Sequence, residues 1–442
     1  VGLSWKSAIY VDLTARNDWS STLPSDSRSY FYPSVSGSFI PTAFYNPLEE
    51  VLDFWKVRAS WTVDKKDLSE YEINRVFDVN TDVWNGMSTA GYPSKLRDPN
   101  IKPETEASYE FGTDFRFFNN RLGFDYTFFS RLRYDRLIEA DISEASGAKK
   151  IITNTAEELR QRGMEFTLTG KPIVTKEFQW ESALNVAYWH WYYDKLDPVY
   201  SSQDPRIGVG ERYDKYFFTD WETDHAGNIV HQAGLPVKNK YQSVIGYKDP
   251  KCILGWTNRF FYKGFDLSVS IDGRIGGVMY SWTEQAMWHS GVHPDSDNRW
   301  RYDEVVNGKQ NYIGSGVKVV SGSASYDPYG KVLEDTRVFA PNDVPVSYQN
   351  YTMNYNENPW DHDARQNIKN GSFLKLREVA LNYTLPATIA QKLLMKKVRV
   401  GVIGQNLLMW TKEFKFSDPD RGKENLNTPT SRYVGFNIDL TF

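Results

Sequence analysis

The residue types that most often carry chemistry are sparse in this chain, which has six histidines and one cysteine among 442 residues. Only His289 and His293 have the spacing of a helical metal-binding pair. Gly291 and Pro294 favour a loop there, and no third ligand is evident in the sequence. The single cysteine, Cys252, can form neither an internal disulfide nor a thiolate metal site. We therefore expect no metal site and no cofactor.

A catalytic arrangement is conceivable at Asp361, His362 and Asp363, where two carboxylates could orient an imidazole for general acid–base work. A solvated polar loop is the simpler explanation, as it is for the adjacent carboxylates Glu157 and Glu158. The sequence contains no phosphate-binding loop, dinucleotide fingerprint or Gly-x-Ser-x-Gly elbow. We therefore predict that the protein is not an enzyme.

Aromatic residues make up 15% of the chain, and many of those in long polar stretches lie beside Asp, Asn and Arg. Aromatic rings suit the apolar faces of sugars, and neighbouring amides and carboxylates suit their hydroxyls. The alternative is that these rings pack the loops or a partner's surface. The candidate substrate-contact residues are Trp191, Tyr193, Trp221, Trp282, Trp288, Trp300, Tyr329 and Trp360.

The elements that must position these residues show a period of two. From Trp55 to Val63, apolar side chains alternate with polar ones, which is typical of a strand with one apolar face. No amphipathic helical stretch of comparable quality appears. The same alternation predicts about twelve strands, many of them long enough to cross a membrane at the ~9 to 11 residues that a tilted strand needs. They lie at residues 9–15, 30–40, 55–63, 108–117, 122–137, 163–169, 178–189, 252–262, 265–271, 373–384, 398–408 and 434–442.

The connections between these strands alternate between tight turns and long loops, the latter at about 64–104, 191–251 and 276–371. Short turns on one side and long loops on the other are typical of an outer-membrane barrel, and such loops are uncommon in compact soluble domains. The predicted fold is therefore all-β, a transmembrane antiparallel β-barrel. A soluble sandwich or propeller is the alternative.

Composition excludes two other classes of protein. The mean hydropathy is −0.57, and no apolar run approaches the ~20 residues of a spanning helix, which excludes a helical membrane protein. The chain has 56 acidic and 52 basic residues and no block of basic residues, so no nucleic-acid partner is indicated.

The end of the chain alternates as well. Phe436, Ile438, Leu440 and Phe442 share one face of the last predicted strand. A final strand of this kind resembles the signal by which outer-membrane barrels are recognised for assembly. Placing it at the periplasm would put every long loop outside the cell.

Several ordered motifs carry a resemblance that spans nearly the whole chain. The chain resembles the barrel of SusC/RagA-type TonB-linked outer-membrane transporters. The motifs are Ala15-Arg16-Asn17-Asp18-Trp19, Tyr30-Phe31-Tyr32-Pro33-Ser34, Lys102-Pro103-Glu104-Thr105, Tyr109-Glu110-Phe111-Gly112, Gly371-Ser372-Phe373-Leu374-Lys375-Leu376-Arg377, Tyr383-Thr384-Leu385-Pro386 and Gly404-Gln405-Asn406-Leu407-Leu408.

The resemblance implies a 22-stranded barrel filled by an N-terminal plug, and about twelve C-terminal strands of it are present here. The family's signal sequence, TonB box, plug and remaining strands have no counterpart in the chain. The family implies import of glycan oligosaccharides or peptides, driven by the TonB complex through the missing N-terminal half. A SusD-like surface lipoprotein would act as a lid, in a dimer of transporter–lid pairs within outer-membrane lipid.

One departure from the family concerns calcium. Many relatives carry an Asp-rich stretch where this chain has Asp224-His225-Ala226-Gly227-Asn228, and too few carboxylates remain for a calcium cage. This departure and the missing half leave a second function open, a non-transporting barrel that serves as a structural or docking subunit. A passive porin is a third possibility, with an open conductive lumen.

Overall fold

The computed structural model describes residues 1–74, 76–201, 204–356, 364–421 and 430–442. These residues form two compact units. The first comprises Val1–Pro172 and Ala183–Tyr213, and the second comprises Ile173–Ser182 and Asp214–Phe442. Thirteen strands, all but β1 of nine residues or more, hydrogen-bond as one antiparallel sheet, in the order β1-β2-β3-β4-β8-β9-β12-β13-β18-β19-β26-β27-β28. The all-β expectation is confirmed, and all twelve predicted strands are present.

The sheet of the first unit runs through successive antiparallel pairs, such as Leu13 opposite Val35. Its polar face carries paired charges, among them Arg58, whose guanidinium donates to both carboxylate oxygens of Asp125 at 2.7 and 2.8 Å. The additional strand relative to the prediction is β1. The strands are β1 (Gly2–Trp5), β2 (Ile9–Trp19), β3 (Ser29–Phe39), β4 (Leu52–Lys66), β8 (Glu104–Phe117), β9 (Leu122–Tyr134) and β12 (Glu158–Val174), with most of β13 (Phe178–Lys195).

The strands of the second unit show the predicted alternation most clearly. Phe436 and Ile438 are 82% and 59% exposed and lie opposite Val402 and Val400, so this face is apolar and uncovered. On the other face, Asp266 of β19 accepts hydrogen bonds from Arg259 of β18 and from Arg399 of β27. An exposed apolar face backed by a polar one is expected of a membrane strand. These strands are β18 (Cys252–Tyr262), β19 (Phe265–Ile275), β26 (Phe373–Thr384), β27 (Lys397–Thr411) and β28 (Tyr433–Thr441).

The tight turn between β18 and β19 depends on two residues with positive φ, Lys263 at 45° and Gly264 at 90°. Two-residue hairpin turns favour such conformations because their twist matches that of the strands. A Cβ on residue 264 would lie 2.9 Å from the carbonyl oxygen of Thr384, so glycine is required there.

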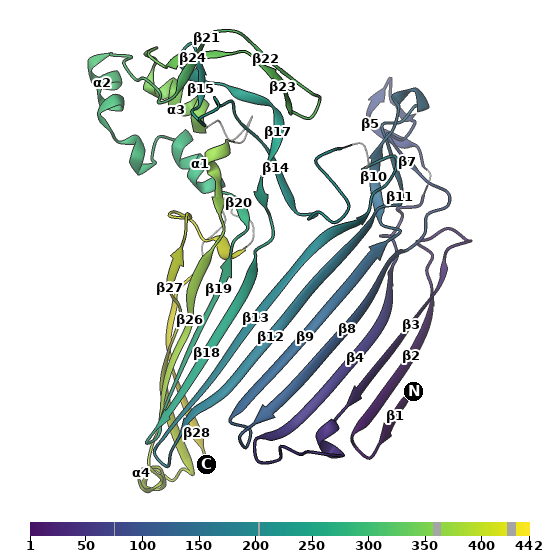
Figure 1. The fold of residues 1–442 in the computed structure, drawn as a ribbon, viewed down its shortest axis with the longest axis vertical. Coiled ribbons are helices and arrows are strands. Elements are labelled where there is room, and N and C mark those ends of the chain that lie inside the picture. Colours follow the sequence, from purple (N-terminus) through teal and green to yellow (C-terminus); the bar gives the residue numbers. More distant parts are fainter. Residues whose placement is uncertain (75, 202–203, 357–363, 422–429) are drawn as a thin grey trace. The chain divides into compact units, whose positions relative to one another are not determined.

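The connections β4–β8 and β9–β12 of the first unit contain secondary structure rather than plain loop. In Figure 1, β5, β7, β10 and β11 lie beyond one end of the long strands of this unit. Leu23, Leu68, Ile101 and Ile152 form a small hydrophobic core there. The short strands are β5 (Asp78–Trp84), β6 (Met87–Gly91), β7 (Lys95–Arg97), β10 (Leu137–Asp141) and β11 (Lys150–Asn154).

The connections of the second unit also carry short elements. In Figure 1 the helices α1, α2 and α3 lie beyond one end of β18, β19, β26 and β27, and α4 lies at the other end. The helices are α1 (Trp282–His289), α2 (Arg299–Asn307), α3 (Tyr348–Asn356) and α4 (Ala387–Lys392). The strands are β14 (Lys215–Trp221), β15 (Val230–Gln232), β16 (Leu235–Pro236), β17 (Lys238–Tyr247), β20 (Val278–Tyr280), β21 (Val317–Ser321), β22 (Ala324–Tyr326), β23 (Val332–Asp335), β24 (Val338–Pro341) and β25 (Ile368–Asn370).

Short 3₁₀ turns occur at Pro41–Ala43, Glu144–Ser146, Pro294–Ser296, Arg365–Asn367 and Pro419–Arg421. The loops contain four short helices that the alternation of apolar residues did not predict. They have only six to nine residues, and α1, α2 and α3 show little apolar periodicity. Within the described ranges, no helix is long and apolar enough to span a bilayer.

Candidate functional site

The helices of the connection between β19 and β26, here called the β19–β26 loop (residues 276–371), begin at polar caps. The Ser281 hydroxyl accepts from the backbone N–H of Glu284 at the start of α1. The Asn298 side chain accepts from the backbone N–H groups of Trp300 and Arg301 at the start of α2. Serine and asparagine are favoured N-caps because their side chains satisfy the first N–H groups of a helix. These caps fix where each helix begins.

A run of stacked aromatic rings forms the interior of the loops of the second unit. Trp221 lies flat on Tyr355, with ring centroids 5.5 Å apart, and Tyr355 stacks on Tyr351 at 5.8 Å. Tyr351 contacts Tyr312 at 4.8 Å, and Trp300 meets Tyr312 edge-on at 5.7 Å. Because Trp221 is only 7% exposed, its ring contributes to packing.

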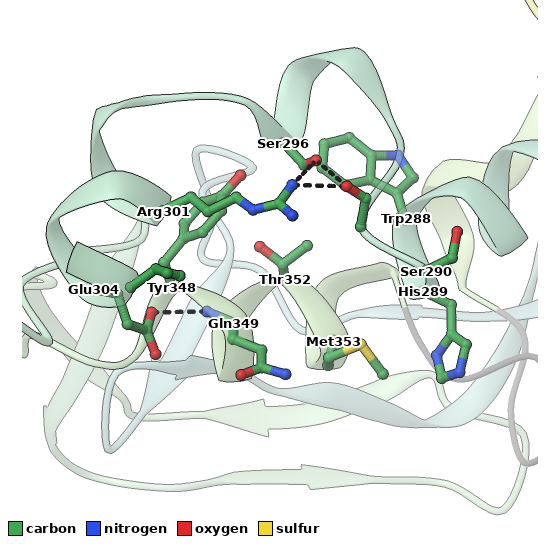
Figure 2. A pocket seen from close by; sticks show the side chains of 12 residues that line it. Trp288, His289, Ser290, Ser296, Arg301, Glu304, Tyr348, Gln349, Thr352 and Met353 are labelled. Carbon is green, nitrogen blue, oxygen red and sulfur yellow. Dashed lines mark hydrogen bonds between the residues drawn. The ribbon is translucent and has the colours of Figure 1, made fainter. Parts of the chain in front are cut away.

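A cavity of about 280 Å³ opens in the β19–β26 loop. Figure 2 shows Thr352 near its middle, between Arg301 on one side and Gln349 and Met353 on the other. The cavity combines an indole ring, a guanidinium, a carboxylate, a hydroxyl and an amide. It is lined by Trp288, His289, Ser290, Gly291, Ser296, Arg301, Glu304, Val305, Tyr348, Gln349, Thr352 and Met353.

The two charged side chains of the cavity are held in place by hydrogen bonds. Arg301 Nη1 donates to the carbonyl oxygen of Gly291 at 2.7 Å and to the hydroxyl of Ser296 at 3.0 Å. Glu304 accepts from the Ser347 hydroxyl at 2.5 Å and from the backbone N–H of Gln349 at 3.1 Å. The carboxylate thereby lies at the N-terminus of α3, where a negative charge is favoured. Both groups are pre-organised before any ligand arrives.

The indole of Trp288 is also fixed. The imidazole of His293 stacks on it, with ring centroids 3.9 Å apart and planes 10° apart. His293 is buried, and its Nδ1 accepts from the backbone N–H of Asp295. Burial lowers the pKa of His293 and outweighs the nearby carboxylates of Glu284 and Asp295, which favours the neutral ring.

Of the histidine pair singled out in the sequence, His293 packs against Trp288. His289 is the last residue of α1 and lines the cavity, while His293 lies beyond the helix. In the described part of the chain, the two do not belong to a group of three possible metal ligands.

A second loop packs against this one. Phe416, in the segment between β27 and β28, meets the edge of the His293 ring at 5.0 Å, and Phe414 in the same segment is buried. The segment is joined to β26 by ion pairs. Lys375 Nζ lies 2.5 Å from Asp418 and 3.0 Å from Asp420, and the Lys375 side chain is 2% exposed. We call residues 412–421 the anchored segment.

A second cation extends this network. The guanidinium of Arg377 donates to Asp420 at 2.7 Å and to Asp272 at 2.6 Å. Burial alone would raise the pKa of Asp420, but hydrogen bonds from Arg377 and Lys375 outweigh it and hold that pKa below its usual value. Asp420 is therefore ionised at neutral pH.

Seven of the eight candidate contact residues lie in the described part of the chain. Among those that the structure describes, Trp288 alone lines the cavity. Trp282 precedes it in α1 and packs on Tyr280 at 5.0 Å. Tyr329 lies between β22 and β23, where its backbone N–H donates to Asp327. Trp360 and the Asp361-His362-Asp363 stretch lie outside the described residues.

The two candidates of the first unit, Trp191 and Tyr193, lie near the end of β13. Arg133 lies over the Trp191 ring at 4.4 Å from its centroid. Tyr193 is buried and meets Tyr213 edge-on at 5.3 Å. The substrate roles of all eight residues stay predictions.

Sequence reasoning missed most of the cavity lining, notably Arg301, Glu304 and Thr352. These residues come together only through the packing of α2 and α3, which no spacing in the sequence indicates. One local signal could have located α1, because Ser281 and Glu284 form the Ser-x-x-Glu pattern of a capping box.

The stretch Asp224–Asn228, which departs from the family's calcium pattern, forms hydrogen bonds within itself. Asp224 accepts from the backbone N–H groups of Ala226 and Asn228 and from the Asn228 side chain. These bonds lower the pKa of Asp224. The carboxylate is thus used within its own turn, and the absence of calcium stays a prediction.

Three curated proteins illustrate what the chain is similar to. It is 22% identical over 98% of its length to TonB-dependent receptor P3 of Formosa agariphila, covering 42% of that protein. It is 21% identical over 99% of its length to TonB-dependent receptor P26 of the same organism, covering 45% of it. It is 25% identical over 60% of its length to TonB-dependent receptor SusC of Bacteroides thetaiotaomicron, covering 30% of it. The chain thus spans less than half the length of these relatives.

Solved structures show the same fold. The RagAB peptide transporter matches with a TM-score of 0.71 at 19% identity, over 98% of this chain and 46% of the matched chain. The RagAB peptide importer in its open-open state matches over the whole of this chain, also with a TM-score of 0.71. No protein-family model matches the sequence.

Proposed function

Because the chain belongs to the SusC/RagA family of TonB-dependent receptors, which are proteins of the Gram-negative outer membrane, we propose that it contributes to an importer of large nutrients. The observation that carries the proposal is that TonB-dependent receptors match 98 to 99% of this chain. These relatives are named as receptors and not as enzymes, in agreement with the expectation from the sequence.

The faces of the strands support this role. Apolar side chains such as Phe436 and Ile438 are exposed on one face, as lipid contact requires. Paired charges on the other face of the same unit, such as Arg259 with Asp266, suit a lumen that holds water or a plug. The family likeness extends this to TonB-driven opening and to a SusD-like lipoprotein over the outer loops.

The nutrient is an oligosaccharide or a peptide. RagAB is described as a peptide importer, whereas aromatic rings beside polar groups, as in the β19–β26 loop, suit sugars. Under this proposal the chain binds and passes the nutrient and performs no catalysis.

The test is uptake of labelled oligosaccharides and labelled peptides by cells that carry or lack the full-length receptor. We expect receptor-dependent uptake of one of these classes, and loss of that uptake when the proton-motive force is collapsed or TonB is deleted. Uptake that persists without TonB would instead indicate a passive porin. Receptor-independent uptake of every probe would favour the docking subunit and overturn the proposal.

A further inference from the structure

We propose that the cavity of the β19–β26 loop is a binding site for a single uncharged sugar ring, such as the end of an oligosaccharide. The inference rests on the proposed import function and adds to it a defined contact site. Its volume of about 280 Å³ lies just under the ~300 to 1,000 Å³ of typical small-molecule pockets, so it suits one small unit better than a long chain.

The aromatic part of the lining is Trp288. His293 covers one face of this indole at 3.9 Å, and the remaining surface contributes to the cavity. A ring whose orientation is already fixed loses little conformational freedom when a ligand binds. Sugars present apolar C–H faces between their hydroxyls, and an aromatic side chain beside polar groups complements such a ligand.

The polar part of the lining retains hydrogen-bonding capacity. Arg301 donates from Nη1 to Gly291 and Ser296. A guanidinium has five N–H donors, so further donors remain for a ligand. The hydroxyl of Thr352 and the side-chain amide of Gln349 form no hydrogen bond with the described residues. Together these groups offer both donors and acceptors, which is what a ring bearing several hydroxyls requires.

Charge argues against an anionic ligand in this cavity. The positive charge of Arg301 is accompanied by the negative charge of Glu304, whose oxygens already accept from Ser347 and Gln349. A carboxylate or phosphate would be attracted by Arg301 but repelled by Glu304. An extended peptide is also a poorer fit, because the lining supplies side-chain groups rather than a free strand edge.

The experiment measures binding of glucose, galactose, mannose and N-acetylglucosamine to the purified full-length receptor in detergent, by saturation-transfer NMR and calorimetry. Tri-alanine and acetate serve as peptide and anion probes. We expect at least one sugar to bind, and Trp288→Ala to weaken that binding about tenfold or more. Thr352→Val removes only the hydroxyl at nearly constant volume and is also expected to weaken binding.

The matched control is Tyr302→Ala, which removes an exposed aromatic ring of α2 that does not line the cavity and is expected to keep the sugar affinity. Wild-type affinity in either Trp288→Ala or Thr352→Val would overturn the inference, as would binding of tri-alanine or acetate but of no sugar. Binding needs no TonB. Absent uptake with intact sugar binding would therefore refute the proposed import alone, and uptake without sugar binding would refute this site alone.

Discussion

Replacing Phe442 by aspartate is expected to reduce insertion of the full-length protein into the outer membrane severalfold more than Trp300→Asp. Phe442 is 74% exposed and directly follows β28, whose uncovered apolar face carries Phe436, Ile438 and Leu440. A charge there opposes lipid burial and, if this strand carries the assembly signal, also its recognition. Trp300 packs on Tyr312 in a loop, so its loss should leave assembly intact.

The measurement is the amount of folded receptor in isolated outer membranes, scored by its heat-modifiable migration on gels. Equal insertion of the two variants would show that the last strand carries no special assembly signal. Such a result would also remove the reason for assigning Phe436, Ile438, Leu440 and Phe442 that role.

Replacing Lys375 by methionine is expected to release the anchored segment from the sheet. The ammonium lies within 2.5 and 3.0 Å of two carboxylates and is almost fully buried. Methionine fills a similar volume but leaves Asp418 without its cation, and removing one partner of a buried ion pair typically costs about 3 to 5 kcal/mol. The loss of stability cannot exceed the free energy with which the anchored segment binds the sheet, because a segment that detaches returns its carboxylates to water.

The pH dependence of docking should change sign in this variant. Burial alone would raise the pKa of Asp418, but hydrogen bonds from Lys375 and Thr430 outweigh it and leave the pKa below its usual value. A carboxyl group whose pKa is lower in the docked segment than its unfolded value of about 3.9 stabilises docking at pH values above about 3.9. This stabilisation is lost as the pH falls through the pKa of the docked state. Without Lys375, burial should raise the pKa of Asp418, so docking should strengthen as the pH falls.

Spin-label mobility can follow this release. The label is attached through Lys415→Cys in a Cys252→Ser background, and spectra are compared between about pH 4 and pH 8. We expect a mobile label in the Lys375→Met variant at neutral pH, and partial recovery when Asp418→Asn is added. Lys412→Met, a change at an exposed lysine of the same segment, is the matched control. A label that stays immobile in Lys375→Met would show that the ion pairs do not hold the segment.

The strands were predictable because their signal is local. In β19, Phe265, Leu267, Val269 and Ile271 alternate with polar residues, and lipid on one side and a polar lumen on the other preserve that period. The tight turns followed from the same pattern, since they fall where the alternation is interrupted.

The loops were not predictable in the same way, because their structure depends on contacts between distant residues. Lys375 and Asp418 are 43 positions apart, and nothing near either residue indicates the other. Trp221 and Trp288 are alike in sequence as tryptophans among polar residues. Tertiary packing places the first in the aromatic interior and the second at the cavity.

Native mass spectrometry of the detergent-extracted full-length complex tests the central claim most directly. The importer proposal predicts that the receptor carries its plug and co-purifies with a SusD-like lipoprotein, in equal numbers. A stable receptor with neither would contradict import and make the docking subunit the better explanation. The aromatic loops would then be contacts for another protein.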